Sequence, residues 1–258
     1  MASTTTMAAY VRIVAAQGCY VDFTTPSITE ITAGDITPDL TQELVLQKII
    51  HKTRPMVYRG TLDGTPVIVK IALNNDIERL SRETRRYFTL EDLQGTVIPR
   101  CYNHVIGSTP IKGQTKPSDI ECLILEDCGE PVEDFFCLKL EDRYAYAHFI
   151  IIGIESLLIF IPFRIEILNG LLAIHARELD HTEFVEKHVV RGSQGYRITG
   201  LKHISRKHQC PWDSEHDNWN VGGYYNKNFP CEGLKTAGVR MNIWRRGIYF
   251  PVTPLNIY

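Results

Sequence analysis

The chain has 258 residues, of which 44% are hydrophobic, and it is long enough to bury a full core within one domain. Its 28 Lys and Arg residues nearly balance 30 Asp and Glu residues, which gives a formal net charge of −2 at pH 7. This balance argues against binding to nucleic acid or to an anionic membrane surface.

Residues 1–9 are rich in Ala, Ser and Thr and are predicted to be disordered. They contain neither the basic nor the apolar region of a secretory signal. The seven cysteines are scattered and odd in number, so we expect free thiols in a reducing compartment and a cytoplasmic protein. The segment from Tyr10 to Phe23 predicts an additional pair of strands, with residues 24–27 as its turn.

Two β-rich runs, Val57–Gly60 and Val67–Lys70, flank a turn at Asp63–Pro66. Val67 and Val69 alternate toward the interior, so a strand that ends in Lys70 would place an ammonium group at the mouth of a dry pocket. The alternative is an exposed hairpin that carries a solvated lysine.

Residues 77–88 have the spacing of an amphipathic helix. The predicted buried stripe consists of Ile77, Leu80, Thr84, Tyr87 and Phe88. Glu83 is expected beside this stripe, where a helix packed on the sheet would aim its carboxylate at Lys70. The alternative for Glu83 is a solvated charge on the helix surface.

The polar run at 108–119 contains two prolines and predicts a surface connection. The segment that follows, from Glu121 to Leu125, is typical of a buried strand. It leads into an acidic turn from Glu126 to Gly129, which includes Cys128.

An almost wholly apolar run extends from Phe149 to Phe163 and is shorter than the roughly 20 residues that a membrane span needs. We therefore expect no span, and a buried helix is one alternative. Another is that residues 144–163 are a translated, unspliced intron. If they are removed and the flanking Arg143 and Arg164 are merged, an uninterrupted helix leads into Leu171.

Residues 171–183 predict a helix followed by a loop with two histidines. From about residue 40 to 210, the order of these segments resembles the protein-kinase fold, and the loop resembles that of fungal protein-kinase-like proteins. The resemblance implies an α+β, two-lobed fold. Its β-rich N-lobe would occupy residues 10–126 and a shortened helical C-lobe residues 127–258.

The resemblance also implies which residues would serve ATP. Lys70 stands in the place of the lysine that holds the α- and β-phosphates, and Glu83 in the place of the glutamate that positions it. Glu126 and Cys128 stand in the hinge that meets the adenine edge through its backbone. Glu183 occupies the position of the catalytic aspartate.

Other positions depart from what phosphoryl transfer needs. The turn at residues 50–56 has no glycine to let backbone N–H groups approach phosphates, and Pro55 removes a donor. His188, in the position of the metal-binding asparagine, is a poor ligand for Mg²⁺, and Gly200 offers no carboxylate in the D-F-G position.

We therefore expect a pseudokinase that binds nucleotide weakly, or a protein partner through its scaffold, without a good site for Mg²⁺. One alternative is an active ATP-dependent phosphotransferase that uses Glu183 as its catalytic carboxylate. Another is a truncated or mis-spliced gene product without a ligand.

The tail after Gly200 is short for a complete kinase C-lobe, and hydrophobic periodicity fades over residues 211–235, which are predicted to be loosely ordered. Its metal-capable side chains are His203, His208, Cys210, His216 and Cys231. Their spacings match no zinc template and include no C-x-x-C pair, so we expect no metal site.

Overall fold

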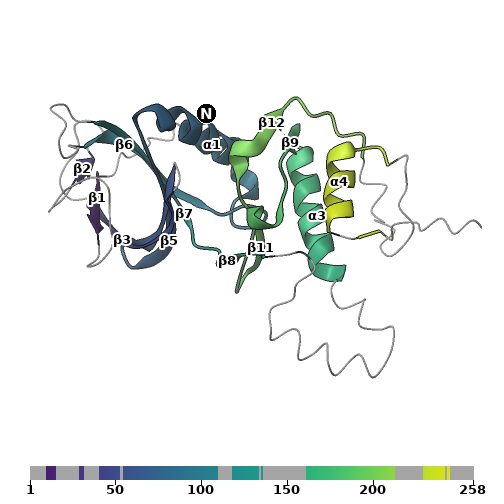
Figure 1. Cartoon of the computed structure of the whole chain (residues 1–258), viewed down its shortest axis with the longest axis horizontal. Coiled ribbons are helices and arrows are strands. Elements are labelled where there is room, and N and C mark those ends of the chain that lie inside the picture. The colour runs from purple at the N-terminus through teal and green to yellow at the C-terminus, as the bar shows by residue number, and fades with distance from the viewer. Residues whose placement is uncertain are drawn as a thin grey trace, which may run out of the picture. The chain divides into compact units, whose positions relative to one another are not determined.

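The computed structural model describes residues 10–15, 29–31, 41–52, 55–109, 118–133, 135, 161–212, 229–241 and 243–244. They form an α+β protein, as predicted (Figure 1). The chain divides into two compact units. The first comprises Met1–Glu130 and Arg191–Lys202, and the second comprises Pro131–Val190 and His203–Tyr258.

A seven-stranded sheet of order β2-β1-β3-β4-β5-β7-β6 forms the first unit. β1 and β3 are parallel, and the other neighbouring strands are antiparallel. The strands are β1 (Tyr10–Ala15), β2 (Thr29–Ile31), β3 (Thr41–His51), β4 (Met56–Leu62), β5 (Thr65–Leu73), β6 (Cys101–Thr109) and β7 (Ser118–Glu126). β1 lies in the region predicted for an additional strand pair, but its partner β2 begins beyond the predicted turn.

The predicted hairpin is formed by β4 and β5. Its turn residues, Asp63 and Gly64, have φ angles of 48° and 82°, as a two-residue turn with two left-handed positions requires. The carboxylate of Asp63 accepts a hydrogen bond from the N–H of Glu43 at 2.8 Å, which ties the turn to β3. The turn therefore fixes the register between β4 and β5, the strand that carries Lys70.

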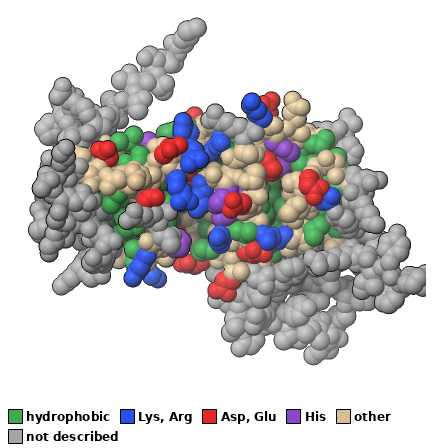
Figure 2. All heavy atoms as spheres, turned by 45° about the horizontal axis from the view of Figure 1, so that its top comes forward, with side chains coloured by type: hydrophobic (Ala, Val, Ile, Leu, Met, Phe, Trp, Pro, Cys, Tyr) green, Lys and Arg blue, Asp and Glu red, His purple; other side chains and the backbone are tan. Residues whose placement is uncertain are grey.

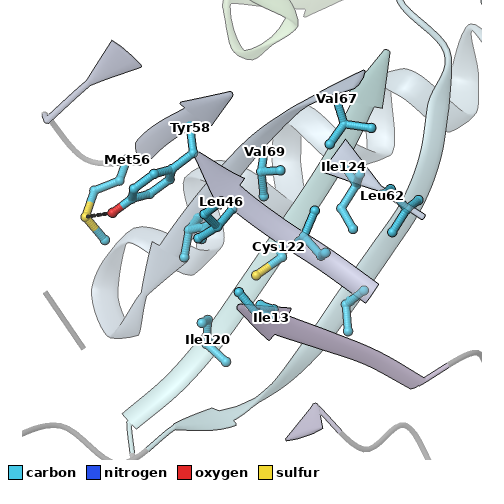
Figure 3. Close-up of a cluster of buried hydrophobic side chains, with 13 residues drawn as sticks. Ile13, Leu46, Met56, Tyr58, Leu62, Val67, Val69, Ile120, Cys122 and Ile124 are labelled. Carbon is cyan, nitrogen blue, oxygen red and sulfur yellow. Dashed lines mark hydrogen bonds between the residues drawn. The ribbon is translucent and has the colours of Figure 1, made fainter. Parts of the chain in front are cut away.

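Alternate residues of β5 and β7 build the core of the sheet (Figure 3). Val67 and Val69 are fully buried, which confirms their predicted inward orientation, and they pack with Cys122 and Ile124. Because successive side chains of a strand point to opposite faces, Lys70 lies on the other face of β5.

Helix α1 (Ile77–Thr89) packs against β5 and β7 on the face that carries Lys70. It follows the short helix η2 (Asn74–Asp76) and precedes η3 (Glu91–Leu93). Its buried residues are Leu80, Glu83, Thr84 and Tyr87. The predicted stripe is therefore wrong at Phe88, which is 55% exposed, and Glu83 lies on the buried face rather than beside it.

The outer face of α1 is basic. Arg79, Arg82 and Arg85 are exposed, and Figure 2 shows Lys and Arg side chains gathered over this helix. The charged outer face fits a helix packed on one side of a sheet, whereas the inner face mixes apolar Leu80 and Tyr87 with polar Glu83 and Thr84.

A later segment of the chain, residues 191–202, completes the first unit. The guanidinium of Arg197 donates a hydrogen bond to the carbonyl of Gly95 at 2.7 Å, and the N–H of Ile198 donates to that of Val97 at 2.8 Å. A small sheet has the strand order β11-β10-β8. The chain passes from one unit to the other within β8, within β10 and within one short helix. These elements are β8 (Glu130–Pro131), β10 (Val189–Gly192), β11 (Gly195–Ile198) and η6 (Leu201–His203).

The second unit contains α3 (Ile161–His175) and α4 (Glu232–Arg240), which pack side by side (Figure 1). Two antiparallel strands, β9 (Leu179–His181) and β12 (Ile204–Arg206), lie in the same unit, with the short helix η5 (Glu186–His188). The buried apolar residues of the two long helices are Ile167, Leu168, Leu171, Ile174, Leu234 and Ala237.

Two predicted segments of this unit, residues 144–163 and 211–235, are described only in part. Helix α3 begins at Ile161, so only the last three residues of the hypothetical intron insert are seen, and residues 144–160 lie outside the described part of the chain. Helix α4 begins at Glu232, so the prediction of loose order over 211–235 is wrong at its C-terminal end. No described helix is long and apolar enough to span a membrane.

Candidate functional site

Lys70 and Glu83 form an ion pair within the first unit. The Nζ atom of Lys70 lies 2.5 Å from Oε1 of Glu83, and their side chains are 15% and 2% exposed. β5 supplies the ammonium and the inner face of α1 supplies the carboxylate. The alternative of a solvated lysine and a solvated glutamate is therefore wrong.

The burial of this pair has a physical consequence. A carboxylate removed from water is tolerated only when an opposite charge and hydrogen bonds compensate it, so Glu83 depends on Lys70. Tyr87 lies one turn further along α1 and is fully buried. Burial, and then the negative charge of Glu83, raise the pKa of the Tyr87 hydroxyl well above its ordinary value, so Tyr87 stays neutral.

A second buried carboxylate, Glu121 of β7, holds α1 against the sheet. Glu121 is fully buried, and its oxygens accept hydrogen bonds from the hydroxyls of Ser81 at 2.5 Å and Thr84 at 3.4 Å. Its Oε1 also lies 2.8 Å from Nε2 of His104 on β6. The sequence predicts Glu121 only as part of a buried strand, although a charged residue inside an apolar strand signals a buried polar network.

The predicted hinge, from Glu126 to Gly129, is held by hydrogen bonds at both ends. The N–H of Glu126 donates to the carbonyl of Arg100 at 2.9 Å, and the Glu126 carboxylate accepts from the N–H of Arg100 at 3.1 Å. Asp127 is paired with Arg59 at 2.6 Å and accepts from the N–H of Gly129 at 3.0 Å. The side chain of Glu126 is thus occupied by the protein's own backbone.

Close packing against β10 fixes the rest of this hinge. Gly129 has a φ of +94°, and a Cβ there would lie 2.1 Å from the carbonyl oxygen of Arg191. A Cβ on Gly192 would lie 2.6 Å from the carbonyl oxygen of Cys128, so both positions require glycine. Burial raises the pKa of the Cys128 thiol to about 12, so Cys128 is a neutral packing residue.

The turn predicted at residues 50–56 is shorter in the structure, since β3 extends to His51 and β4 begins at Met56. Lys52, the described basic residue of this turn, is exposed, and residues 53–54 lie outside the described part of the chain. No glycine is present in this turn to bring backbone N–H groups close to a phosphate.

In the second unit, Glu183 lies on the loop after β9 with its side chain 67% exposed, and its Oε2 is 2.9 Å from Nδ1 of His203. The backbone carbonyl of Glu183 lies 2.9 Å from Nδ1 of His188. Glu183 is therefore accessible as a carboxylate, and its loop is held in place by His188.

His188 itself is buried and sits between two other imidazoles. Its ring centroid is 5.1 Å from that of His181 and 5.1 Å from that of His203. Burial, and then the nearby His181, lower the pKa of His188 to about 3, so the ring is neutral at pH 7. With Nδ1 donating to a carbonyl, the neutral ring has one nitrogen acceptor left and no oxygen for Mg²⁺.

The metal-capable residues of the tail separate into two places in the second unit. His203 lies beside Glu183, whereas His208, Cys210 and Cys231 lie together with His175 of α3. His216 lies outside the described residues. No protein-family model matches this chain, and no curated protein matches it either.

Proposed function

We propose that this chain is a protein-kinase-like pseudokinase, which binds nucleotide weakly and serves as a scaffold for a protein partner, with little or no phosphoryl transfer. The observation that carries the proposal is the Lys70–Glu83 ion pair. It links the strand and the helix that a kinase-like fold would use to hold the phosphates of a nucleotide.

The pair gives Lys70 the properties that a phosphate-binding lysine needs. An ammonium group has three donors, and Glu83 accepts one of them. The 15% exposure of the Lys70 side chain leaves the group partly accessible, while its buried partner restricts its position. A nucleotide phosphate would add a second anion to a cation that is already oriented.

Three features argue against efficient transfer. Gly200 has no side chain to bind metal, His188 is a buried neutral imidazole, and the turn between β3 and β4 has no glycine. Catalysis of phosphoryl transfer depends mainly on positioning and on electrostatic stabilisation by metal ions, so loss of the metal ligands removes the largest contribution. The accessible carboxylate of Glu183 does not replace them.

The test is nucleotide binding to the full chain, measured by thermal shift and by calorimetry with ATP and with adenosine, each with and without Mg²⁺. We expect ATP to stabilise the protein without a requirement for Mg²⁺. Lys70→Met should weaken ATP binding by about 1–3 kcal/mol, the usual contribution of a hydrogen bond to a charged group, and should leave adenosine binding unchanged.

Lys48→Met is the matched control, because Lys48 is an exposed lysine on β3 of the same sheet. ATP binding that needs Mg²⁺ would favour the active phosphotransferase. If wild-type protein binds neither nucleotide, or if Lys70→Met and Lys48→Met bind ATP equally well, the proposed nucleotide site is wrong.

A further inference from the structure

Four side chains with metal-binding atoms meet in the second unit. His175 is the last residue of α3, His208 and Cys210 follow β12, and Cys231 immediately precedes α4. One ligand atom from each lies within 4.8 Å of all the others. Three separate segments of the chain therefore converge on one point.

The spacing of these atoms suits a tetrahedral zinc ion. The Sγ atom of Cys231 lies 3.5 Å from Nδ1 of His175 and 3.5 Å from Nε2 of His208. With Zn–S near 2.3 Å and Zn–N near 2.0–2.1 Å, two ligands at a tetrahedral angle are separated by about 3.5 Å. Both measured separations thus equal those of a sulfur and a nitrogen that share one zinc ion.

The surroundings of His175 orient it as a metal ligand. Its Nε2 lies 3.1 Å from Oδ1 of Asp180, so the nitrogen that faces the cluster is Nδ1. A carboxylate on the outer nitrogen of a ligating histidine is a common partner in zinc sites, because it fixes the ring and increases its basicity. His175 is 3% exposed, which makes this arrangement a feature of the interior.

The packing of α4 adds to this arrangement. A Cβ on Gly233 would lie 2.6 Å from Oδ1 of Asp180 and 3.1 Å from Cε1 of His175, so glycine is needed for α4 to approach so closely. His208 is held by a separate contact, since its backbone N–H donates to the backbone carbonyl of Glu178 at 3.0 Å. Each histidine is thus positioned by a contact outside the cluster.

We propose that His175, His208, Cys210 and Cys231 bind one structural zinc ion. Two thiolates and two imidazoles form a set that prefers zinc over the oxygen-seeking Mg²⁺ and Ca²⁺, and the two thiolates balance the charge of Zn²⁺. Four protein ligands leave no open position, so the ion holds α3, the segment after β12 and α4 together. This role does not rest on nucleotide binding.

This proposal replaces the expectation of no metal site. The sequence pattern does not identify the ligands. His208 and Cys210 are two residues apart, but His175 lies far before them and Cys231 far after them. The resemblance to the kinase fold places His175 in a scaffold helix, and the four ligands come together only when α3, the segment after β12 and α4 pack.

The first measurement is the metal content of the full chain, purified under reducing conditions from cells supplied with zinc. We expect about one zinc ion per chain, and its removal by a strong chelator should lower Tm. Cys231→Ser and Cys210→Ser should lose the zinc. Cys101→Ser, at a free thiol in the first unit, is the matched control and should retain it.

A cobalt titration keeps the test decisive if the variants fail to fold. Wild-type chain stripped of metal should bind Co²⁺ with the visible bands of a tetrahedral ion and the near-ultraviolet absorption of cobalt–thiolate bonds, and zinc should displace the cobalt. A zinc-free wild-type chain that gives no such spectrum would show that the four groups do not bind metal. Zinc retained by both cysteine variants would place the metal elsewhere.

Discussion

The hydroxyl of Ser81 on α1 donates a 2.5 Å hydrogen bond to the carboxylate of Glu121, which is fully buried at the centre of β7. The same carboxylate is reached by Thr84, one turn from Ser81, and by His104. Glu83 lies between Ser81 and Thr84 in the sequence of the same helix. The contacts of Glu121 therefore help to hold the part of α1 from which Glu83 reaches Lys70.

The Glu121 contacts predict a stability effect. Glu121→Ala would leave the polar groups of Ser81, Thr84 and His104 buried without their acceptor, and unfolding free energy should fall by about 3 kcal/mol. Urea unfolding of the full chain measures this loss. Glu78→Ala is the control, because Glu78 is on the same helix with 81% of its side chain exposed, and it should change stability by less than about 0.5 kcal/mol. Equal effects of the two substitutions would contradict this role for Glu121.

The Lys70–Glu83 pair predicts strong non-additivity. Lys70→Met alone leaves a buried carboxylate without its cation and should destabilise the protein by about 3–5 kcal/mol. The double variant Lys70→Met/Glu83→Leu removes both charges and should recover much of that loss. Unfolding free energies of the wild type, the two single variants and the double variant form the necessary cycle. Additive effects would mean that the two charges do not depend on each other.

Phosphoryl transfer should be negligible. Wild-type protein should transfer the γ-phosphate of ATP to itself or to a generic protein substrate no faster than Glu183→Ala, as measured with radiolabelled ATP. The combined changes Gly200→Asp and His188→Asn should raise the rate, because they would supply the oxygen ligands for Mg²⁺ that the proposed kinase-like function assigns to these two positions. Gly200 has a φ of +71°, which Asp tolerates better than most residues do. Robust wild-type transfer that Glu183→Ala abolishes would make the active phosphotransferase the better interpretation.

His188 predicts a pH dependence of stability. Its pKa is lowered to about 3 in the folded chain, whereas an unfolded histidine binds a proton near pH 6.5. Between these values the unfolded state holds the additional proton, so this group's contribution falls as the pH decreases, by up to about 1.4 kcal/mol per pH unit. His188→Asn should remove that part of the slope. Wild type and variant should therefore differ in the slope of unfolding free energy between about pH 6 and pH 5, and parallel curves would contradict the prediction.

Local patterns predicted part of this fold correctly. Asp63 and Gly64 predicted the turn, and the alternation of Val67 and Val69 predicted which side chains of β5 point inward. The match of Glu83 with Lys70 depends on the resemblance to the kinase fold, because the helical period alone places Glu83 beside the buried stripe. The prediction for Phe88 is wrong because its spacing fits the buried stripe, whereas its ring makes an edge contact with the His104 ring on β6, at 6.3 Å between centroids, and its side chain stays 55% exposed.

The contacts of Glu121 and His175 could not be predicted in this way. Ser81 and Glu121 are 40 residues apart, and His175 and Cys231 are 56 residues apart, so their meeting depends on how whole elements pack. Neither residue has a periodic pattern that identifies its partners. Only the tertiary arrangement distinguishes a buried polar network or a ligand set from isolated polar residues.

The hydrogen bonds from Arg197 and Ile198 to Gly95 and Val97 have a consequence for synthesis of the chain. Because residues 191–202 belong to the first unit, this unit cannot acquire all its native contacts when residue 130 leaves the ribosome. About sixty more residues, including α3, must emerge before that segment can dock. The first unit can therefore begin to fold early but cannot complete its contacts until residues 191–202 have emerged. A nascent chain arrested before residue 191 should expose the carbonyls of Gly95 and Val97 to water or to chaperones.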